Sequence, residues 1–98
     1  MAAYIYGNIE IHDPVLYETY RLQVPAVIAA HGGRYLVRGG AAALLEGDVQ
    51  VARQVILEFP DMPSLKAFYD SPEYVVLRAI RQKAASGSLV AVEGVLPG

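Results

Sequence analysis

The strict alternation of residues 3–11 constrains the fold of this chain more than any other feature. Ile5, Ile9 and Ile11 fall on one side of this segment, whereas tyrosine, asparagine and glutamate side chains fall on the other. A period of two, with β-branched and aromatic residues, indicates a strand that buries one of its faces. The segment should therefore belong to a sheet whose two faces have different environments.

Two proline-containing signals, Asp13-Pro14 and Ser71-Pro72, predict the starts of two helices. The Asp or Ser side chain accepts a hydrogen bond from the first turn, and proline fits the first helical position. Gly32-Gly33 and Gly87 are expected to end these helices in a left-handed conformation. A shorter helix is expected to begin at Asp61.

Three further segments, residues 34–38, 53–59 and 88–95, have the composition of strands, and residues 96–98 form a tail. The order strand-helix-strand-strand-helix-strand is that of the ferredoxin-like split βαβ fold. Right-handed crossovers place the helices on one face of a four-stranded antiparallel sheet. Because the chain has 98 residues, we expect one α+β domain over residues 1–98, with the strands in the spatial order four, one, three, two.

The opposite face of the sheet, called the bare face below, is expected to lack a helical cover. We assign Val90 and Val92 to the helix side, because they suit a core better than their neighbours do. The residues assigned to the bare face are Tyr4, Tyr6, Asn8, Glu10, Gln54, Ile56, Glu58, Leu89, Ala91 and Glu93. The residues expected in the core are Ile5, Ile9, Leu57, Phe59, Phe68 and Leu77. An exposed apolar patch usually marks an interface, and a second copy related by a two-fold axis is its simplest cover. We therefore expect a homodimer through the bare face.

Composition supports this expectation and argues against several classes of partner. Hydrophobic residues make up 54% of the chain and charged residues 18%, against about 45–50% and about 25% in typical proteins. The net charge is −2 and the basic residues are not clustered, which argues against a nucleic-acid partner. The chain has no cysteine, no signal-peptide pattern and no long apolar run, so we expect a cytoplasmic protein without a membrane segment.

Three motifs in order resemble a family of short bacterial proteins of unknown function. They are RYLVRGG at residues 34–40, VILEFP at residues 55–60 and FYDSPEY at residues 68–74. The resemblance covers nearly the whole chain, and it implies a ferredoxin-like protomer and a homodimer of the dimeric α/β-barrel superfamily. Other members of that superfamily are cofactor-free monooxygenases, muconolactone isomerases and haem-binding chlorite dismutases. Assigning one of these activities here would rest on analogy of fold alone.

Two residues are candidates for proton transfer. His31, at the end of the first helix, could act as a general base, since its unperturbed pKa is about 6.5; alternatively, it caps the last carbonyls of the helix. Glu58, on a covered sheet face, needs a partner, and Arg38 on the neighbouring strand is the nearest cation. Our hypothesis is that Arg38 orients an anionic or enolic substrate while Glu58 handles a proton. The alternative is a structural ion pair within the dimer.

Tyr6, Asn8 and Tyr69 complete the candidate binding set. Tyr69 belongs to an aromatic cluster beside the Ser71-Pro72 helix break, where it either gates a pocket or packs in the core. Two histidines far apart in sequence do not form a metal-ligand set, and the glycine pairs do not form a phosphate loop, so we expect neither metal nor cofactor. The predicted function is a small cofactor-free oxygenase or isomerase acting on an aromatic or acidic compound. The alternative is a non-catalytic dimeric module that binds a ligand or serves as a scaffold.

Overall fold

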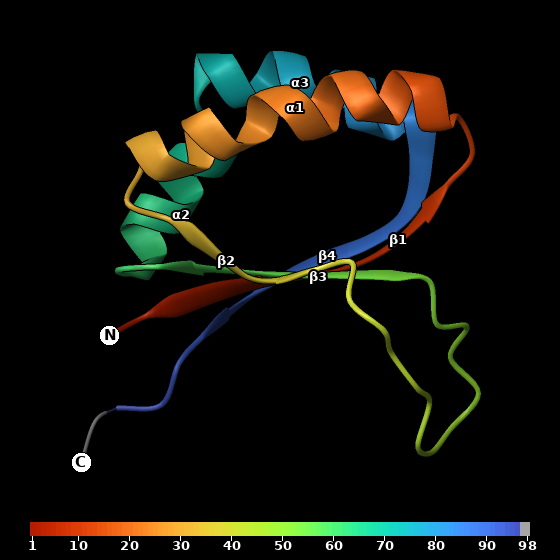
Figure 1. Cartoon of the computed structure of the whole chain (residues 1–98). Coiled ribbons are helices and arrows are strands. Elements are labelled where there is room, and N and C mark those ends of the chain that lie inside the picture. The colour runs from red at the N-terminus through yellow and green to blue at the C-terminus, as the bar shows by residue number, and fades with distance from the viewer. Residues whose placement is uncertain (97–98) are drawn as a thin grey trace.

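The computed structural model describes residues 1–96, and the end of the predicted tail, residues 97–98, lies outside the described residues. Its elements are β1 (Ala3–Ile11), α1 (Pro14–Ala30), β2 (Arg34–Arg38), β3 (Arg53–Phe59), α2 (Met62–Tyr69), α3 (Pro72–Ala84) and β4 (Ala85–Glu93). The four strands form one antiparallel sheet in the order β2-β3-β1-β4. Figure 1 shows the helices on one side of this sheet and no helix on the other. The predicted ferredoxin-like α+β fold is therefore confirmed.

The three helices begin where the sequence signals predict. Each is preceded by a residue whose side chain accepts a hydrogen bond from the first turn, and each has proline at its first or second position. The cap bonds run from the backbone N–H of Leu16 to Asp13 (3.0 Å), of Ser64 to Asp61 (2.7 Å) and of Tyr74 to Ser71 (3.2 Å). The end of α1 also follows the prediction, because Gly32 has a φ of 77°.

The end of α3 differs from the prediction. The helix ends at Ala84, β4 begins at Ala85 without a loop, and Gly87 lies inside the strand instead of ending the helix. Gly87 has a φ of 133°, and a Cβ there would overlap the backbone oxygen of Asn8 on β1. The glycine is therefore needed for β4 to approach β1 closely.

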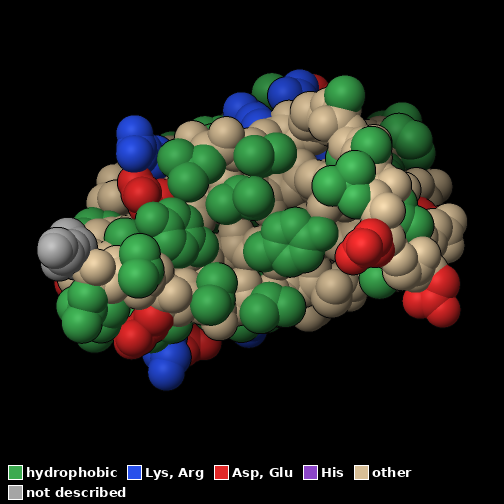
Figure 2. All heavy atoms as spheres, turned by 90° about the horizontal axis from the view of Figure 1, so that it is seen from below, with side chains coloured by type: hydrophobic (Ala, Val, Ile, Leu, Met, Phe, Trp, Pro, Cys, Tyr) green, Lys and Arg blue, Asp and Glu red, His purple; other side chains and the backbone are tan. Residues whose placement is uncertain are grey.

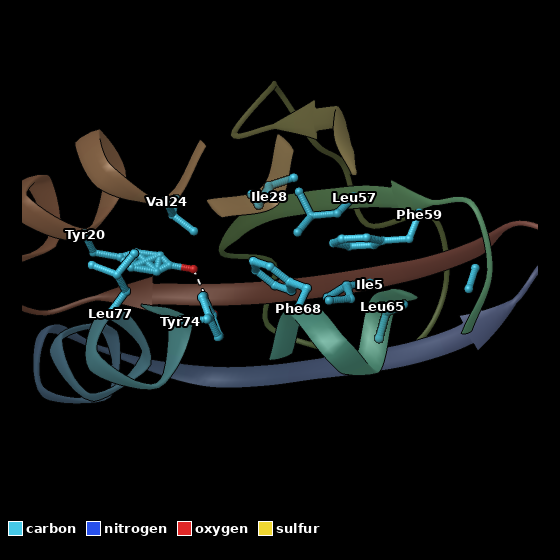
Figure 3. Close-up of a cluster of buried hydrophobic side chains, with 11 residues drawn as sticks. Ile5, Tyr20, Val24, Ile28, Leu57, Phe59, Leu65, Phe68, Tyr74 and Leu77 are labelled. Atoms are coloured by element: carbon cyan, nitrogen blue, oxygen red, sulfur yellow. Dashed lines mark hydrogen bonds between the residues drawn. The ribbon is translucent and has the colours of Figure 1, made fainter. Parts of the chain in front are cut away.

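The core between helices and sheet contains the residues expected there. Figure 3 shows five of them, Ile5, Leu57, Phe59, Phe68 and Leu77, among the helices and the strands. All six predicted residues are buried, namely Ile5, Ile9, Leu57, Phe59, Phe68 and Leu77. Aromatic rings connect the two layers: Phe59 lies 5.1 Å from Phe68, and Phe68 lies 4.4 Å from Tyr74, between ring centroids. Such contacts stabilise the domain beyond simple area burial.

The two faces of β4 are inverted relative to the prediction. The pairs that show this are Tyr4–Val92, Tyr6–Val90, Gly7–Leu89, Ile5–Ala91 and Ala3–Glu93. Val90 and Val92 therefore lie on the bare face, and Leu89, Ala91 and Glu93 lie on the helix side. Both alternating sets of β4 contain apolar residues, so its own periodicity does not distinguish the faces. Figure 2 shows hydrophobic side chains gathered on the bare face.

Candidate functional site

A cavity of about 40 Å³ lies between the helices and the sheet. Its polar lining consists of four tyrosines and four arginines: Tyr17, Tyr20, Tyr35, Tyr74, Arg21, Arg38, Arg53 and Arg81. No aspartate, glutamate or histidine lines it among residues 1–96. The volume exceeds what one water molecule requires. We call this space the arginine–tyrosine cavity.

The tyrosines are placed by the helical repeat and by their contacts with one another. Tyr17 and Tyr20, three residues apart on α1, stack with their ring centroids 5.5 Å apart. The hydroxyl of Tyr20 is hydrogen-bonded to the hydroxyl of Tyr74 on α3 at 3.0 Å, the dashed line in Figure 3. The two helices therefore bring one polar pair into an otherwise apolar part of the core.

Two tyrosine hydroxyls of the cavity, those of Tyr20 and Tyr35, are held in their neutral form by burial. Burial, reinforced by Tyr74, raises the pKa of Tyr20 far above its ordinary value. Burial also raises the pKa of Tyr35 on β2. Desolvation disfavours the charged phenolate, so both side chains keep their protons.

The arginines reach the cavity from different elements. On α1, the Nε of Arg21 donates to Glu18 at 2.8 Å, so the charge of this guanidinium is paired. Arg38, at the end of β2, donates to the backbone oxygen of Arg21 at 3.0 Å, and its guanidinium lies 4.5 Å from the centroid of Tyr35. Such stacking is typical of arginine beside aromatic rings.

Arg53 on β3 and Arg81 on α3 are half-buried residues of the site. The guanidinium carbon of Arg53 lies 5.9 Å from the ring centroid of Tyr17. The Nε atoms of Arg53 and Arg81 are buried, and neither has a hydrogen-bond partner within the described part of the chain. Buried donors are normally paired, so the hydrogen-bonding capacity of these two guanidinium groups is not fully used by the protein itself.

The predicted pairing of Arg38 with Glu58 is wrong. The register of β2 against β3 shifts between Tyr35 and Val37. Before the shift, Arg34 lies opposite Glu58 on the bare face; after it, Arg38 lies opposite Val55 on the helix side. A bulge adds one residue and so reverses the faces that follow it. The partner of Glu58 is Arg34, whose Nε donates to the carboxylate at 2.7 Å.

His31 lies outside the arginine–tyrosine cavity. It follows the last residue of α1, its Nδ1 lies 3.0 Å from the backbone oxygen of Val27, and its ring meets the edge of Phe68 at 6.0 Å. This geometry is that of the helix-capping alternative. His31 and Glu58 lie on opposite sides of the sheet, so the structure does not bring the two candidates for proton transfer together.

Asn8 and Tyr6 lie on the bare face, as expected, and both contact polar neighbours there. Tyr6 donates to Gln54. Asn8 donates to the backbone oxygen of Gln50 at 3.0 Å and accepts from the N–H of Ala52 at 2.9 Å. These bonds fix the base of the loop that connects β2 to β3.

Tyr69, at the end of α2, lines a separate groove of about 230 Å³ between α2 and β4. The guanidinium of Arg78 covers its ring at 4.5 Å. Of the six predicted site residues, only Arg38 lines the arginine–tyrosine cavity. The prediction missed the other polar residues of the cavity, including Arg81. One sequence signal could have revealed Arg81: it follows the buried Tyr74 by seven residues, or two helical turns, and so lies on the inward side of the same helix.

Residues 1–96 contain no group of three or more histidine, aspartate or glutamate side chains able to hold a metal ion. Within the same residues, no helix is long and apolar enough to cross a membrane.

A four-stranded antiparallel sheet in this order, with all three helices on one face, defines a small α+β protein with the ferredoxin-like fold. Residues 2–95 match the family described as a domain of unknown function, DUF1330, and the chain belongs to this family. The resemblance seen in the three sequence motifs is thereby confirmed. No curated protein matches the chain.

Several solved structures share the fold. A protein of unknown function from Rhodopseudomonas palustris, RPA0582, is 19% identical, with a TM-score of 0.76 over 98% of this chain and 84% of that chain. SnoaB, a cofactor-independent oxygenase from Streptomyces nogalater, is 11% identical, with a TM-score of 0.65 over 98% and 95%. Rv0793 from Mycobacterium tuberculosis is 14% identical, with a TM-score of 0.61 over 99% and 98%. At these identities the likeness concerns the fold alone.

Proposed function

We propose that this protein is a small-molecule enzyme of the cofactor-free oxygenase or isomerase type, which binds an aromatic or acidic compound in the arginine–tyrosine cavity. The observation that carries the proposal is a cavity in the core whose lining, apolar for its larger part, also includes four arginines and four tyrosines. A bacterial cytoplasmic location, predicted from the sequence, belongs to the same proposal.

The donors of the cavity suit the charge that such reactions develop. Oxygenation and isomerisation of an activated organic compound both proceed through an electron-rich enolate or phenolate. Guanidinium and phenol donors that are already oriented stabilise this oxyanion without reorganising. The shared fold of SnoaB, described as a cofactor-independent oxygenase, is compatible with this chemistry.

One observation favours the alternative of a non-catalytic ligand-binding module. Among residues 1–96, the cavity lining includes no histidine or carboxylate that could remove a proton near neutral pH. A substrate acidic enough to bind as its anion does not need such a base, whereas a less acidic compound would bind without reacting.

We further propose that a second copy covers the bare face. The apolar residues on this face include Tyr4, Tyr6, Ile56, Val90 and Val92, and Figure 2 shows that hydrophobic side chains are numerous over this face. The loop between β2 and β3 projects beyond the bare face in Figure 1 and exposes Leu44, Leu45 and Val49. An apolar area of this kind supports an isologous contact in which the same patch serves both partners.

The test of ligand binding is a panel of small phenols, lactones and aromatic acids, followed by amide chemical shifts in NMR spectra. Val55 lines the cavity, so Val55→Phe should fill it and abolish binding. The matched control is Val76→Phe on the exposed side of α3, which should bind like the wild type. Turnover of each compound that binds is then followed by oxygen uptake and by NMR of the products. Binding that survives Val55→Phe would contradict the assignment of the cavity.

A further inference from the structure

We infer that the arginine–tyrosine cavity is a site for an organic oxyanion, a carboxylate or an enolate, held by Arg53 and Arg81. The inference rests on the proposed function, because it names the class of compound that the cavity binds. Three observations support it: arginines without a counter-charge, unpaired nitrogen atoms of Arg53 and Arg81, and a glycine that leaves room for the guanidinium of Arg53.

The charges at the cavity are not balanced by the protein. Of the two ion pairs within residues 1–96, one joins Arg21 to Glu18 and the other joins Arg34 to Glu58. Arg38, Arg53 and Arg81 all reach the cavity and belong to neither pair. A partly buried charge without a counter-charge is costly. The chain as a whole carries a net charge of −2, so the concentration of arginine here is local.

The guanidinium groups of Arg53 and Arg81 line the cavity and are not fully paired by the protein. Their Nε atoms are buried and have no partner within the described residues. A guanidinium offers its donors as a planar fork that matches the two oxygens of a carboxylate. An oxyanion in the cavity would therefore supply the missing counter-charge and an acceptor for the guanidinium groups that line it.

The backbone leaves room for the guanidinium of Arg53. Gly39 has a φ of 72°, and a Cβ at this position would overlap the Nη1 atom of Arg53. The absence of a side chain at residue 39 thus lets this guanidinium lie where it does. The conformation of the turn after β2, with glycine at position 39, therefore helps to determine where the guanidinium of Arg53 lies.

The hydrogen-bonded pair Tyr20–Tyr74 adds one more hydrogen-bond donor. In the hydrogen bond between Tyr20 and Tyr74 one hydroxyl donates to the other, which leaves one hydrogen free for a further acceptor. The cavity volume of about 40 Å³ suits a compact acidic group, and the exposed Arg38 lies at its edge. A ligand that places its oxyanion inside and the rest of its body toward Arg38 would fit this lining.

Benzoate and benzamide, which have nearly the same shape but differ in charge, test the inference. By titration calorimetry at low salt, the wild type should bind benzoate at least about tenfold more tightly than benzamide, as expected for charge-assisted hydrogen bonds. Arg53→Gln and Arg81→Gln should each remove this preference. The matched control, Arg78→Gln, lies outside the cavity and should retain it. Arg53→Lys keeps the charge and should retain part of it.

The possible outcomes distinguish this inference from the proposed function. Equal affinity for benzoate and benzamide, with shift changes at cavity residues, would overturn the oxyanion inference and leave the ligand-binding proposal standing. Failure of the wild type to bind these two compounds or any member of the panel would overturn both. Melting temperatures identify variants that lose their fold. If Arg53→Gln unfolds, the oxyanion inference stands or falls on whether Arg53→Lys and Arg81→Gln change the benzoate preference in the expected directions.

Discussion

Gly39 illustrates how one residue without a side chain shapes the arginine–tyrosine cavity. In Gly39→Ala, the new Cβ would overlap Arg53, and the left-handed φ of 72° would be strained. We expect a loss of about 1–2 kcal/mol in the free energy of unfolding, together with loss of the preference for benzoate. Gly40→Ala is the control, because a Cβ there meets no atom within 4 Å. Urea unfolding and calorimetry measure the two effects, and equal behaviour of the two variants would show that Gly39 has no such role.

Phe59 tests the core at the same scale. Its side chain is fully buried against Phe68. Phe59→Ala should therefore lower the free energy of unfolding by about 3–5 kcal/mol, the range for deleting a buried aromatic ring. Val15→Ala, on an exposed position of α1, should change it by less than about 0.5 kcal/mol. Urea denaturation at a fixed protein concentration provides the measurement; a loss below about 1 kcal/mol for Phe59→Ala would place this residue at the surface.

The residues of the cavity were harder to predict than those of the core. Phe59 is apolar, and hydrophobic periodicity alone places it inside. Arg53 and Arg81 are charged, and a charged residue normally indicates the surface. Their inward orientation depends on tertiary neighbours such as Tyr17 and Gly39, which lie far from them in sequence.

At the scale of elements, the sequence predicts which face of a strand is buried when aliphatic residues occur on one face only. In β1 the isoleucines share one side, and Ile5 and Ile9 are buried as predicted. In β4 both alternating sets contain apolar residues, so only the pairing with β1 determines that Val90 lies on the bare face. The bulge in β2 could not be predicted from the sequence either, because Leu36, the residue at the shift, is not a residue type that marks a bulge.

Gly87 provides the test of how β4 meets β1. In Gly87→Ala, the Cβ would overlap the backbone oxygen of Asn8 at a φ of 133°. We expect a loss of at least about 2 kcal/mol in the free energy of unfolding, because strain and overpacking act together. Amide hydrogen exchange should become faster along β4. Ser88→Ala, at the next and exposed position, should leave both measurements near wild-type values; equal effects of the two substitutions would contradict the close approach.

At the scale of the whole molecule, the sheet separates two surfaces with different roles in our proposals. The arginine–tyrosine cavity lies on the helix side, and the apolar patch with Tyr6 and Val90 lies on the bare face. The side chains of Arg53 and Arg81 line the cavity, whereas Tyr6 and Val90 lie on the opposite face of the sheet. Substitutions at these separate sites should therefore have nearly additive effects. Ligand preference and assembly can therefore be changed one at a time.

Val90 tests the assembly. Its side chain is half-exposed on the bare face beside Tyr6, so a second copy covering this face would bury it. Light scattering at micromolar concentration should give the wild type twice the 10.6 kDa mass of the chain. Val90→Lys places a charge where the partner would lie, and burying an unpaired ammonium is costly, so this variant should be a monomer. Val76→Lys carries the same change on the exposed side of α3 and should remain a dimer. A monomeric wild type would end the dimer proposal, whereas a dimeric Val90→Lys variant would show that the two copies meet through another face.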